Sequence, residues 1–184
     1  DKCAAVIQAW YPGEEGGNAL ADIIYGNVAP SGKLSVSYPK VELNENICYN
    51  YSSTPDERIQ YHFGYGLNYT TFDYSDLVVD KSAFTTDELF NISFNVTNTG
   101  SREGDEIVQI YISPTSASQP LKPIKLAGFG RVSLKPGETK KIDFIMSPQQ
   151  LGYYNDGIWA IEKGDFIIKV GAASNDIRLT DSIC

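Results

Sequence analysis

The chain has 184 residues, 42% of them hydrophobic, so it can form one domain or one and a half around a globular core. Its formal net charge is −8 and its lysines and arginines are not clustered, which excludes the basic surface that nucleic-acid binding requires. No segment approaches the roughly eighteen uninterrupted apolar residues of a membrane helix. The sequence therefore predicts neither a nucleic-acid partner nor a membrane partner.

The first part of the chain has the pattern of an α/β unit. Residues 3–10 are a nearly continuous apolar run, typical of a strand buried on both faces of a parallel sheet. After a break at residues 11–13, Asn18 is a candidate cap for a helix that ends at Gly26. The apolar face of that helix comprises Leu20, Ile23 and Ile24. One strand and one helix cannot bury both faces of the strand, so we expect them to complete a larger α/β domain. Because Asp1-Lys2-Cys3 does not open a signal peptide, we also expect the chain to continue a longer polypeptide.

A loop region and a glycine-aromatic run follow. Residues 28–56 are rich in Pro, Gly, Ser and Asn around a short β-like segment, residues 34–38, and read as loop. Residues 61–72 then combine two glycines with an aromatic cluster, Tyr61, Phe63, Tyr65, Tyr69 and Phe72. The rings could stack on a sugar, or they could fill a junction where Gly64 and Gly66 let the backbone pass closely. We favour the junction.

Beyond residue 71 the pattern becomes all-β. Candidate strands recur at the spacing of a sandwich, at residues 72–79, 89–98, 106–113, 124–134, 139–146, 157–162, 165–171 and 177–180. Alternation within these strands predicts nine core residues: Val108, Ile110, Ile112, Ile142, Phe144, Met146, Phe166, Ile168 and Val170. The fold class expected is mainly β, an immunoglobulin or fibronectin III-like β-sandwich preceded by the terminal strand-helix segment of an α/β sandwich domain.

Four sequons indicate the compartment. Asn50, Asn68, Asn91 and Asn95 fit the N-glycosylation pattern, with coincidence in an Asn-rich chain as the alternative. Alternation over residues 90–97 places Asn91, Ser93, Asn95 and Thr97 on one face, where glycans would point to solvent.

The three cysteines, Cys3, Cys48 and Cys184, are an odd number, which predicts a free thiol or a bridge to a segment outside this chain. Cys3 and Cys48 are a plausible internal disulfide pair. Neither their spacing nor the single histidine, His62, fits a Cys/His metal site, so no metal and no cofactor are predicted.

Read in order, these segments resemble the C-terminal part of family 3 glycoside hydrolases, the β-glucosidase and β-xylosidase group. The resemblance covers nearly the whole chain. It rests on Pro12-Gly-Glu-Glu-Gly-Gly with the helix after it, on Phe63-Gly-Tyr-Gly-Leu-Asn-Tyr, and on Gly104-Asp-Glu-Ile-Val-Gln, Leu126-Ala-Gly-Phe-Gly-Arg, Leu134-Lys-Pro-Gly-Glu and Gly164-Asp-Phe-Ile-Ile-Lys. It implies an α/β domain end with linker at residues 1–66 and a fibronectin type III-like domain at residues 67–184.

The resemblance also implies where the chemistry lies. The family hydrolyses glycosides with retention, using a nucleophile and an acid/base carboxylate about 5 Å apart. The nucleophile lies on a (β/α)₈-type domain and the acid/base residue lies upstream of residue 12, so neither has a counterpart here. We therefore expect this chain alone to be inactive, with the upstream (β/α)₈-type and α/β domains as partners and glycoside substrate reached only through them. A secreted, extracellular or lysosomal location is expected.

Glu14 and Glu15 are the remaining catalytic candidates. They lie where a strand passes into a helix, the end of an α/β sheet at which ligands bind. Carboxylates there are also favoured by the helix dipole, and we favour that structural role. His62 is expected to be structural or exposed, and Trp10 and Trp159 to lie in the core or an interface. The rival to the enzyme hypothesis is an independent carbohydrate- or protein-binding β-sandwich module.

Overall fold

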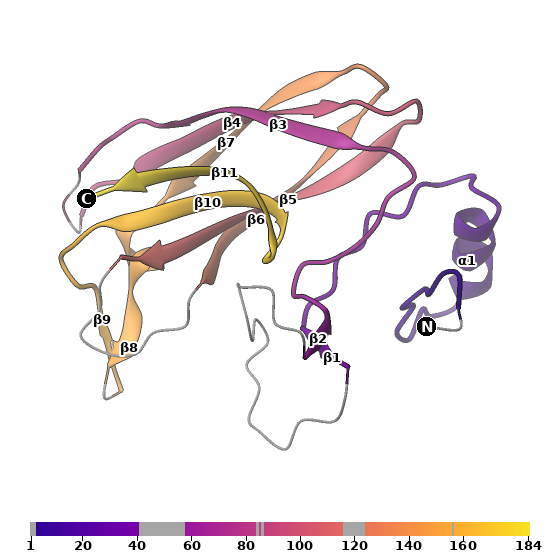
Figure 1. Cartoon of the computed structure of the whole chain (residues 1–184), viewed down its shortest axis with the longest axis horizontal. Helices are drawn as coiled ribbons and strands as arrows, with labels where there is room; N and C mark the ends of the chain where they lie inside the picture. Colours follow the sequence, from indigo (N-terminus) through magenta and orange to yellow (C-terminus); the bar gives the residue numbers. More distant parts are fainter. Residues whose placement is uncertain (1–2, 41–57, 84, 86, 116–123, 156) are drawn as a thin grey trace.

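The computed structural model describes residues 3–40, 58–83, 85, 87–115, 124–155 and 157–184. Most of the chain after residue 71 forms two antiparallel sheets, drawn in Figure 1. The first has the order β3-β4-β7, with β3 at Phe72–Val79, β4 at Phe90–Asn98 and β7 at Thr139–Met146. The second has the order β11-β10-β5-β6, with β5 at Gly104–Pro114, β6 at Lys125–Leu134, β10 at Phe166–Ala173 and β11 at Asp176–Ile183. The predicted mainly β sandwich is confirmed.

The core lies between these sheets and follows the alternation of the strands. Seven of the nine predicted core residues are buried, and the other two, Ile142 and Phe144, are partly buried against the same cluster. Both lie on β7, which is an edge strand and has a neighbour on one side only. Phe94 on β4 stacks between Tyr74 and Phe144, at centroid distances of 6.1 and 6.3 Å. Such aromatic pairs add to the free energy that area burial supplies.

The sequence pattern predicted most strand boundaries, but it did not predict the structure of the connection between β7 and β10. A 3-10 helix, Pro148–Leu151, begins there with a capping box in which Ser147 and Gln150 bond each other's backbone. It leads to a hairpin of β8, Tyr153–Asn155, and β9, Ile158–Ala160. The sequence predicted a longer strand at residues 157–162 and missed β8.

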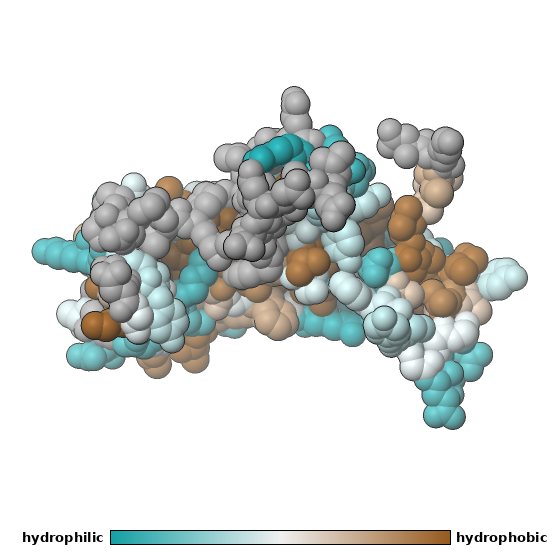
Figure 2. Space-filling view, turned by 90° about the horizontal axis from the view of Figure 1, so that it is seen from below, coloured by the Kyte–Doolittle hydropathy of each residue, from teal (hydrophilic) through white to brown (hydrophobic). Residues whose placement is uncertain are grey.

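The predicted strand at residues 3–10 is wrong for this chain, which has no strand there. A strand buried in a parallel sheet needs neighbours on both sides, and the described residues offer none. Val6 and Trp10 are instead 68% and 57% exposed. Trp10 also has a φ of 51°, outside the extended region. An apolar surface remains at the α1 end, where large hydrophobic residues are exposed: Val6, Ile7, Trp10, Tyr11, Ile24, Tyr25 and Val28. Figure 2 shows hydrophobic residues in brown at this end of the molecule.

Helix α1 spans Gly16–Ile24 and lies on the opposite side of the molecule from the C-terminus (Figure 1). Its N-cap is Glu15, so the predicted cap at Asn18 is wrong, because the helix begins before that residue. The linker that follows α1 is described at residues 25–40 and 58–71. In it two short strands, β1 at Tyr38–Pro39 and β2 at Ile59–Tyr61, pair antiparallel. Within the described ranges no helix is long and apolar enough to cross a membrane.

Candidate functional site

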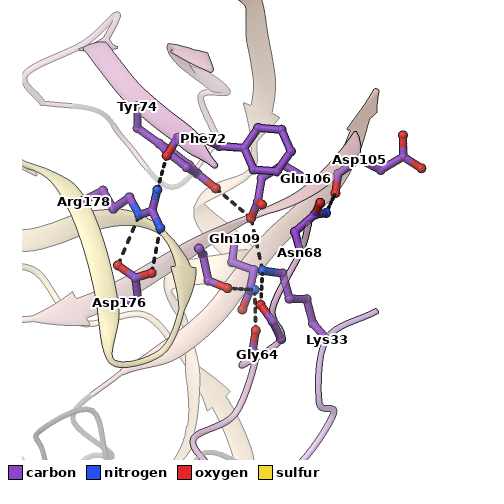
Figure 3. A network of polar contacts seen from close by, with 12 residues as sticks. Lys33, Gly64, Asn68, Phe72, Tyr74, Asp105, Glu106, Gln109, Asp176 and Arg178 are labelled. Carbon is purple, nitrogen blue, oxygen red and sulfur yellow. Dashed lines mark hydrogen bonds and ion pairs between the residues drawn. The ribbon is translucent and has the colours of Figure 1, made fainter. Parts of the chain in front are cut away.

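The linker meets the sandwich in a cluster of buried polar contacts, which we call the seam. It is formed by Lys33, Gly64 and Asn68 of the linker with Glu106, Gln109 and Tyr111 of β5, and Figure 3 shows most of these residues. Within the seam, Glu106 and Gln109 are almost completely removed from solvent, and Lys33 and Asn68 are partly buried.

Glu106 is the charged centre of the seam. It shares the strand phase of Val108 and Ile110, so its carboxylate enters the end of the core, and its side chain is only 5% exposed. Its Oε1 lies 3.2 Å from the Nζ of Lys33, which also donates to the Gly66 carbonyl at 3.2 Å. A carboxylate so buried is stable only when it is paired and hydrogen-bonded. Glu106 thus fixes the linker lysine against the sandwich.

Tyr74 connects Glu106 to the opposite sheet. Its hydroxyl donates to Glu106 Oε1 at 3.2 Å. Burial of the ring, and then the negative charge of Glu106, hold the pKa of Tyr74 well above its usual value, so the phenol remains a donor. Arg178 lies over the Tyr74 ring at 5.1 Å, donates to Asp176 at 2.9 Å and also donates to the Phe72 carbonyl. Its hydrogen bond to Asp176 is the main cause that raises the pKa of Arg178. These contacts join β3 to β11.

Gln109 fixes the glycine-aromatic run on the outer face of β5. Its Nε2 donates to the Gly64 carbonyl at 3.1 Å and to the Ala172 carbonyl at 2.6 Å, while its Oε1 accepts from the Tyr111 hydroxyl. Gly64 has a φ of 80°, and a Cβ there would clash with Gln109. Only glycine fits this position without strain.

Asn68 uses its whole amide group within the seam. Its Nδ2 donates to the Asp105 carbonyl at 3.0 Å, and its Oδ1 accepts from the Thr70 amide at 3.1 Å. A Cβ at Gly104 would lie 2.9 Å from the same Oδ1, so the strand passes close to this side chain. Asn68 therefore behaves as a structural asparagine.

Comparisons with known proteins agree with this arrangement. Residues 1–69 match the glycosyl hydrolase family 3 C-terminal domain, and residues 106–174 match the fibronectin type III-like domain. A thermostable beta-glucosidase B of Acetivibrio thermocellus is 37% identical over 205 aligned residues, which include 100% of this chain and 27% of the relative. The chain belongs to glycosyl hydrolase family 3. It corresponds to the C-terminal part of these enzymes.

Solved structures of family 3 enzymes have the same fold. A β-glucosidase of Bifidobacterium adolescentis has a TM-score of 0.84 at 30% identity, over 96% of this chain and 29% of its own. β-Glucosidase 3B of Thermotoga neapolitana, solved in complex with glucose, has a TM-score of 0.83 at 31% identity, over 96% of this chain and 27% of its own. The chain thus spans about a quarter of the length of the relatives and solved structures that it matches.

The two catalytic candidates lie away from the seam, at the start of α1. Glu15 is the N-cap residue, and its Oε2 accepts a hydrogen bond from Asn18 Nδ2 at 2.7 Å. Glu14 and Glu15 are both exposed to solvent. Glu15 makes no side-chain cap hydrogen bond to the helix amides, and the expected structural role of these two carboxylates stays a prediction.

The aromatic run divides among several environments. Phe72 enters the core, Phe63 packs edge-on against Tyr111 at 6.4 Å, and the rings of Tyr61 and Tyr65 lie 5.4 Å apart. The Tyr69 hydroxyl donates to the Ile23 carbonyl of α1 at 2.7 Å. His62 is buried beside them. The rings therefore pack at a junction, which is the alternative that we favoured over stacking on a sugar.

The sequons on β4 lie on a more open face. Asn91 and Asn95 are half-buried, and their amides donate to Asp143 at 3.3 Å and Asp76 at 2.7 Å. Ser93, expected at the solvent-facing side, is buried, because β4 is flanked by β3 and β7. Asn50 lies outside the described residues, as does Cys48, so the predicted Cys3–Cys48 pair and that sequon stay predictions. Cys3 and Cys184 are exposed.

Proposed function

We propose that this chain is the non-catalytic C-terminal portion of a retaining glycoside hydrolase that acts on β-glucosides or β-xylosides, and that it stabilises the catalytic domains. The names of the relatives, β-glucosidases from bacteria and fungi, support the glucoside substrate class. The nucleophile and the acid/base residue would belong to the upstream domains.

The observation that carries the proposal is the uncovered apolar surface at the α1 end. Val6, Ile7 and Trp10 are all large and exposed on a segment that lacks strand partners. Apolar residues gathered in this way mark an interaction surface. The relatives contain roughly three times as much polypeptide outside the matched part as within it, since the match is 27% of their length. That polypeptide is the expected cover, and the sandwich behind the seam would hold the segment in place.

Co-expression tests the stabilising role. We expect the isolated chain to be prone to association through its apolar surface and to gain solubility when it is expressed with the upstream part of a family 3 enzyme. Ile7→Asp with Trp10→Asp should improve the solubility of the isolated chain and weaken its association with the upstream part. Equal solubility and no association in every case would contradict the proposal.

An aryl β-glucoside assay tests the assignment of the catalytic residues. The purified chain should release no aryl alcohol above the buffer rate. Turnover that is abolished by Glu14→Gln or Glu15→Gln would place the catalytic carboxylates in this chain and overturn the proposal.

The second candidate function is an independent carbohydrate- or protein-binding module. The observation that favours it is the β8–β9 hairpin, on the opposite side of the molecule from α1 in Figure 1, where Tyr154, Ile158 and Trp159 are exposed. Tyr154 and Trp159 lie at 74° with centroids 4.9 Å apart, and Lys125 covers the indole at 4.7 Å. Binding of a soluble β-glucan by the isolated chain, lost in Tyr154→Ala, would support this function.

We also propose that the enzyme is a glycoprotein that works outside the cytosol, in an extracellular or lysosomal compartment. The sequons and the periplasmic β-glucosidase of Salmonella typhimurium, which is 36% identical, support an export route. Of the described sequons, Asn91 and Asn95 are better placed than Asn68 to carry glycans, because the amide of Asn68 holds the seam.

A further inference from the structure

The linker is bonded to the sandwich more closely than to the helix that precedes it. The Leu34 amide donates to the Tyr65 carbonyl at 2.9 Å, and the Gly64 amide donates to the Leu34 carbonyl at 2.7 Å. The Ser174 amide, directly after β10, then donates to the Phe63 carbonyl at 2.9 Å. Together with the buried Lys33–Glu106 ion pair, these bonds continue the sandwich into residues 32–40 and 58–71.

The first residue of this bonded unit is Gly32. Its carbonyl oxygen occupies the place that a Cβ of Gly66 would need, so the two glycine backbones are in close contact. Lys33 follows directly and reaches both Gly66 and Glu106. Separate movement of Gly32 or Lys33 would therefore break contacts with the described residues of the seam.

Helix α1 ends at Ile24, and the turn that follows it is bonded back to the helix as far as Val28. The amides of Asn27 and Val28 donate to the Asp22 carbonyl at 2.8 and 3.2 Å, and the Asn27 side chain donates to Asp22 Oδ1 at 3.0 Å. Within the described structure, residues 29–31 have no hydrogen bond to either side. A joint needs only a few residues that can absorb a change of φ and ψ.

Two exposed side chains hold α1 across this joint. Tyr69 donates to the Ile23 carbonyl at 2.7 Å, Arg102 donates to the Gly26 carbonyl, and the Arg102 guanidinium lies 5.6 Å from the centre of the Tyr69 ring. The Gly26 carbonyl lies just beyond the C-terminal end of α1, where a cation is favoured, and the Ile23 carbonyl also accepts a hydrogen bond from the Gly26 amide at 3.0 Å. We call Tyr69 and Arg102 the clasp.

We propose that the chain divides at residues 29–31, so that the linker moves as one body with the sandwich and the clasp sets the position of α1 relative to that body. The division expected from sequence, between residues 66 and 67, would instead cut through the seam. The inference does not depend on the proposed enzymatic function, because it concerns contacts within this chain alone.

Hydrogen exchange on the intact chain, followed by mass spectrometry, tests the position of the joint. The amides of Leu34, Gly64 and Tyr65 should be protected in common with β5 and β10, because they open only when the sandwich opens. In the Tyr69→Phe, Arg102→Ala double variant, exchange in α1 should rise about tenfold, from the loss of two hydrogen bonds and a cation–π contact. Protection at Leu34 and Gly64 should stay within about twofold of wild type.

Lys33→Met is the complementary variant, and Arg131→Met is its matched surface control. Lys33→Met should raise exchange in the linker and in β5 together, whereas Arg131→Met, which removes an arginine with 63% side-chain exposure, should leave both unchanged. The proposal would be overturned if Leu34 and Gly64 exchanged independently of β5 in the wild type. It would equally be overturned if the clasp variant released the linker along with α1.

Discussion

Replacement of Lys33 by methionine is the most informative perturbation of the seam. The substitution keeps the length and apolar stem of the side chain but removes the ammonium that faces Glu106 at 3.2 Å. The carboxylate, 5% exposed, would keep the neutral Tyr74 hydroxyl as its described partner. Removing one member of a buried ion pair costs about 3–5 kcal/mol. Because Lys33 is itself 13% exposed and water can reach its position, we expect the lower end, about 3 kcal/mol.

Thermal unfolding of the intact chain, followed by circular dichroism, measures this change. A loss of about 3 kcal/mol should lower the thermal midpoint by roughly 6–12 °C for a chain of this size. Adding Glu106→Met to Lys33→Met should recover much of the loss, because the unpaired charge is then removed. Arg131→Met, which breaks an exposed pair with Asp105, should cost less than about 1 kcal/mol. The reasoning is refuted if Lys33→Met costs no more than Arg131→Met, or if the double variant is as unstable as the single one.

Three further predictions concern single residues. Gly64→Ala should destabilise the chain by about 3 kcal/mol or more, from positive φ and a clash with Gln109, whereas Gly137→Ala, with φ of 75° in open space, should cost about 1 kcal/mol in thermal unfolding. The pKa of Tyr74 is raised in the folded state, so its contribution to stability is present below the ordinary tyrosine pKa and is lost as pH rises above about 10. In Tyr74→Phe, the free energy of unfolding should therefore fall less steeply with pH above about 10. An unchanged slope would argue against the burial of this hydroxyl. In a eukaryotic secretory host, peptide mapping should find glycans at Asn95 and none at Asn68, and folded protein with Asn68 fully occupied would contradict its structural role.

The parts of the fold that sequence reveals are those set by short-range alternation. Val108, Ile110 and Ile112 repeat at the period of a strand and are buried as that period demands. The strand expected at residues 3–10 fails for the opposite reason, because a strand needs neighbours as well as apolar residues, and the described chain provides none.

The seam could be predicted only in part from the sequence. Gly64, Gly66 and the surrounding rings predicted a close junction, but the ion pair between Lys33 and Glu106 joins residues that no local pattern connects. One signal was present: Glu106 stands in the same strand phase as Val108 and Ile110, so a charge was due to enter the end of the core. Such a charge requires a partner, although its position in the chain could not be derived.

The central claim, that this chain supports catalysis carried out upstream, is tested most directly with a chimaera. The C-terminal part of Acetivibrio thermocellus β-glucosidase B that aligns with this chain, 27% of that enzyme, is replaced by residues 1–184, and hydrolysis of an aryl β-glucoside is measured per mole of purified protein. We expect an active chimaera, little activity when this part is simply deleted, and an intermediate activity when the graft carries Ile7→Asp and Trp10→Asp. A deletion variant as active and as heat-resistant as the chimaera would contradict a supporting role for this chain.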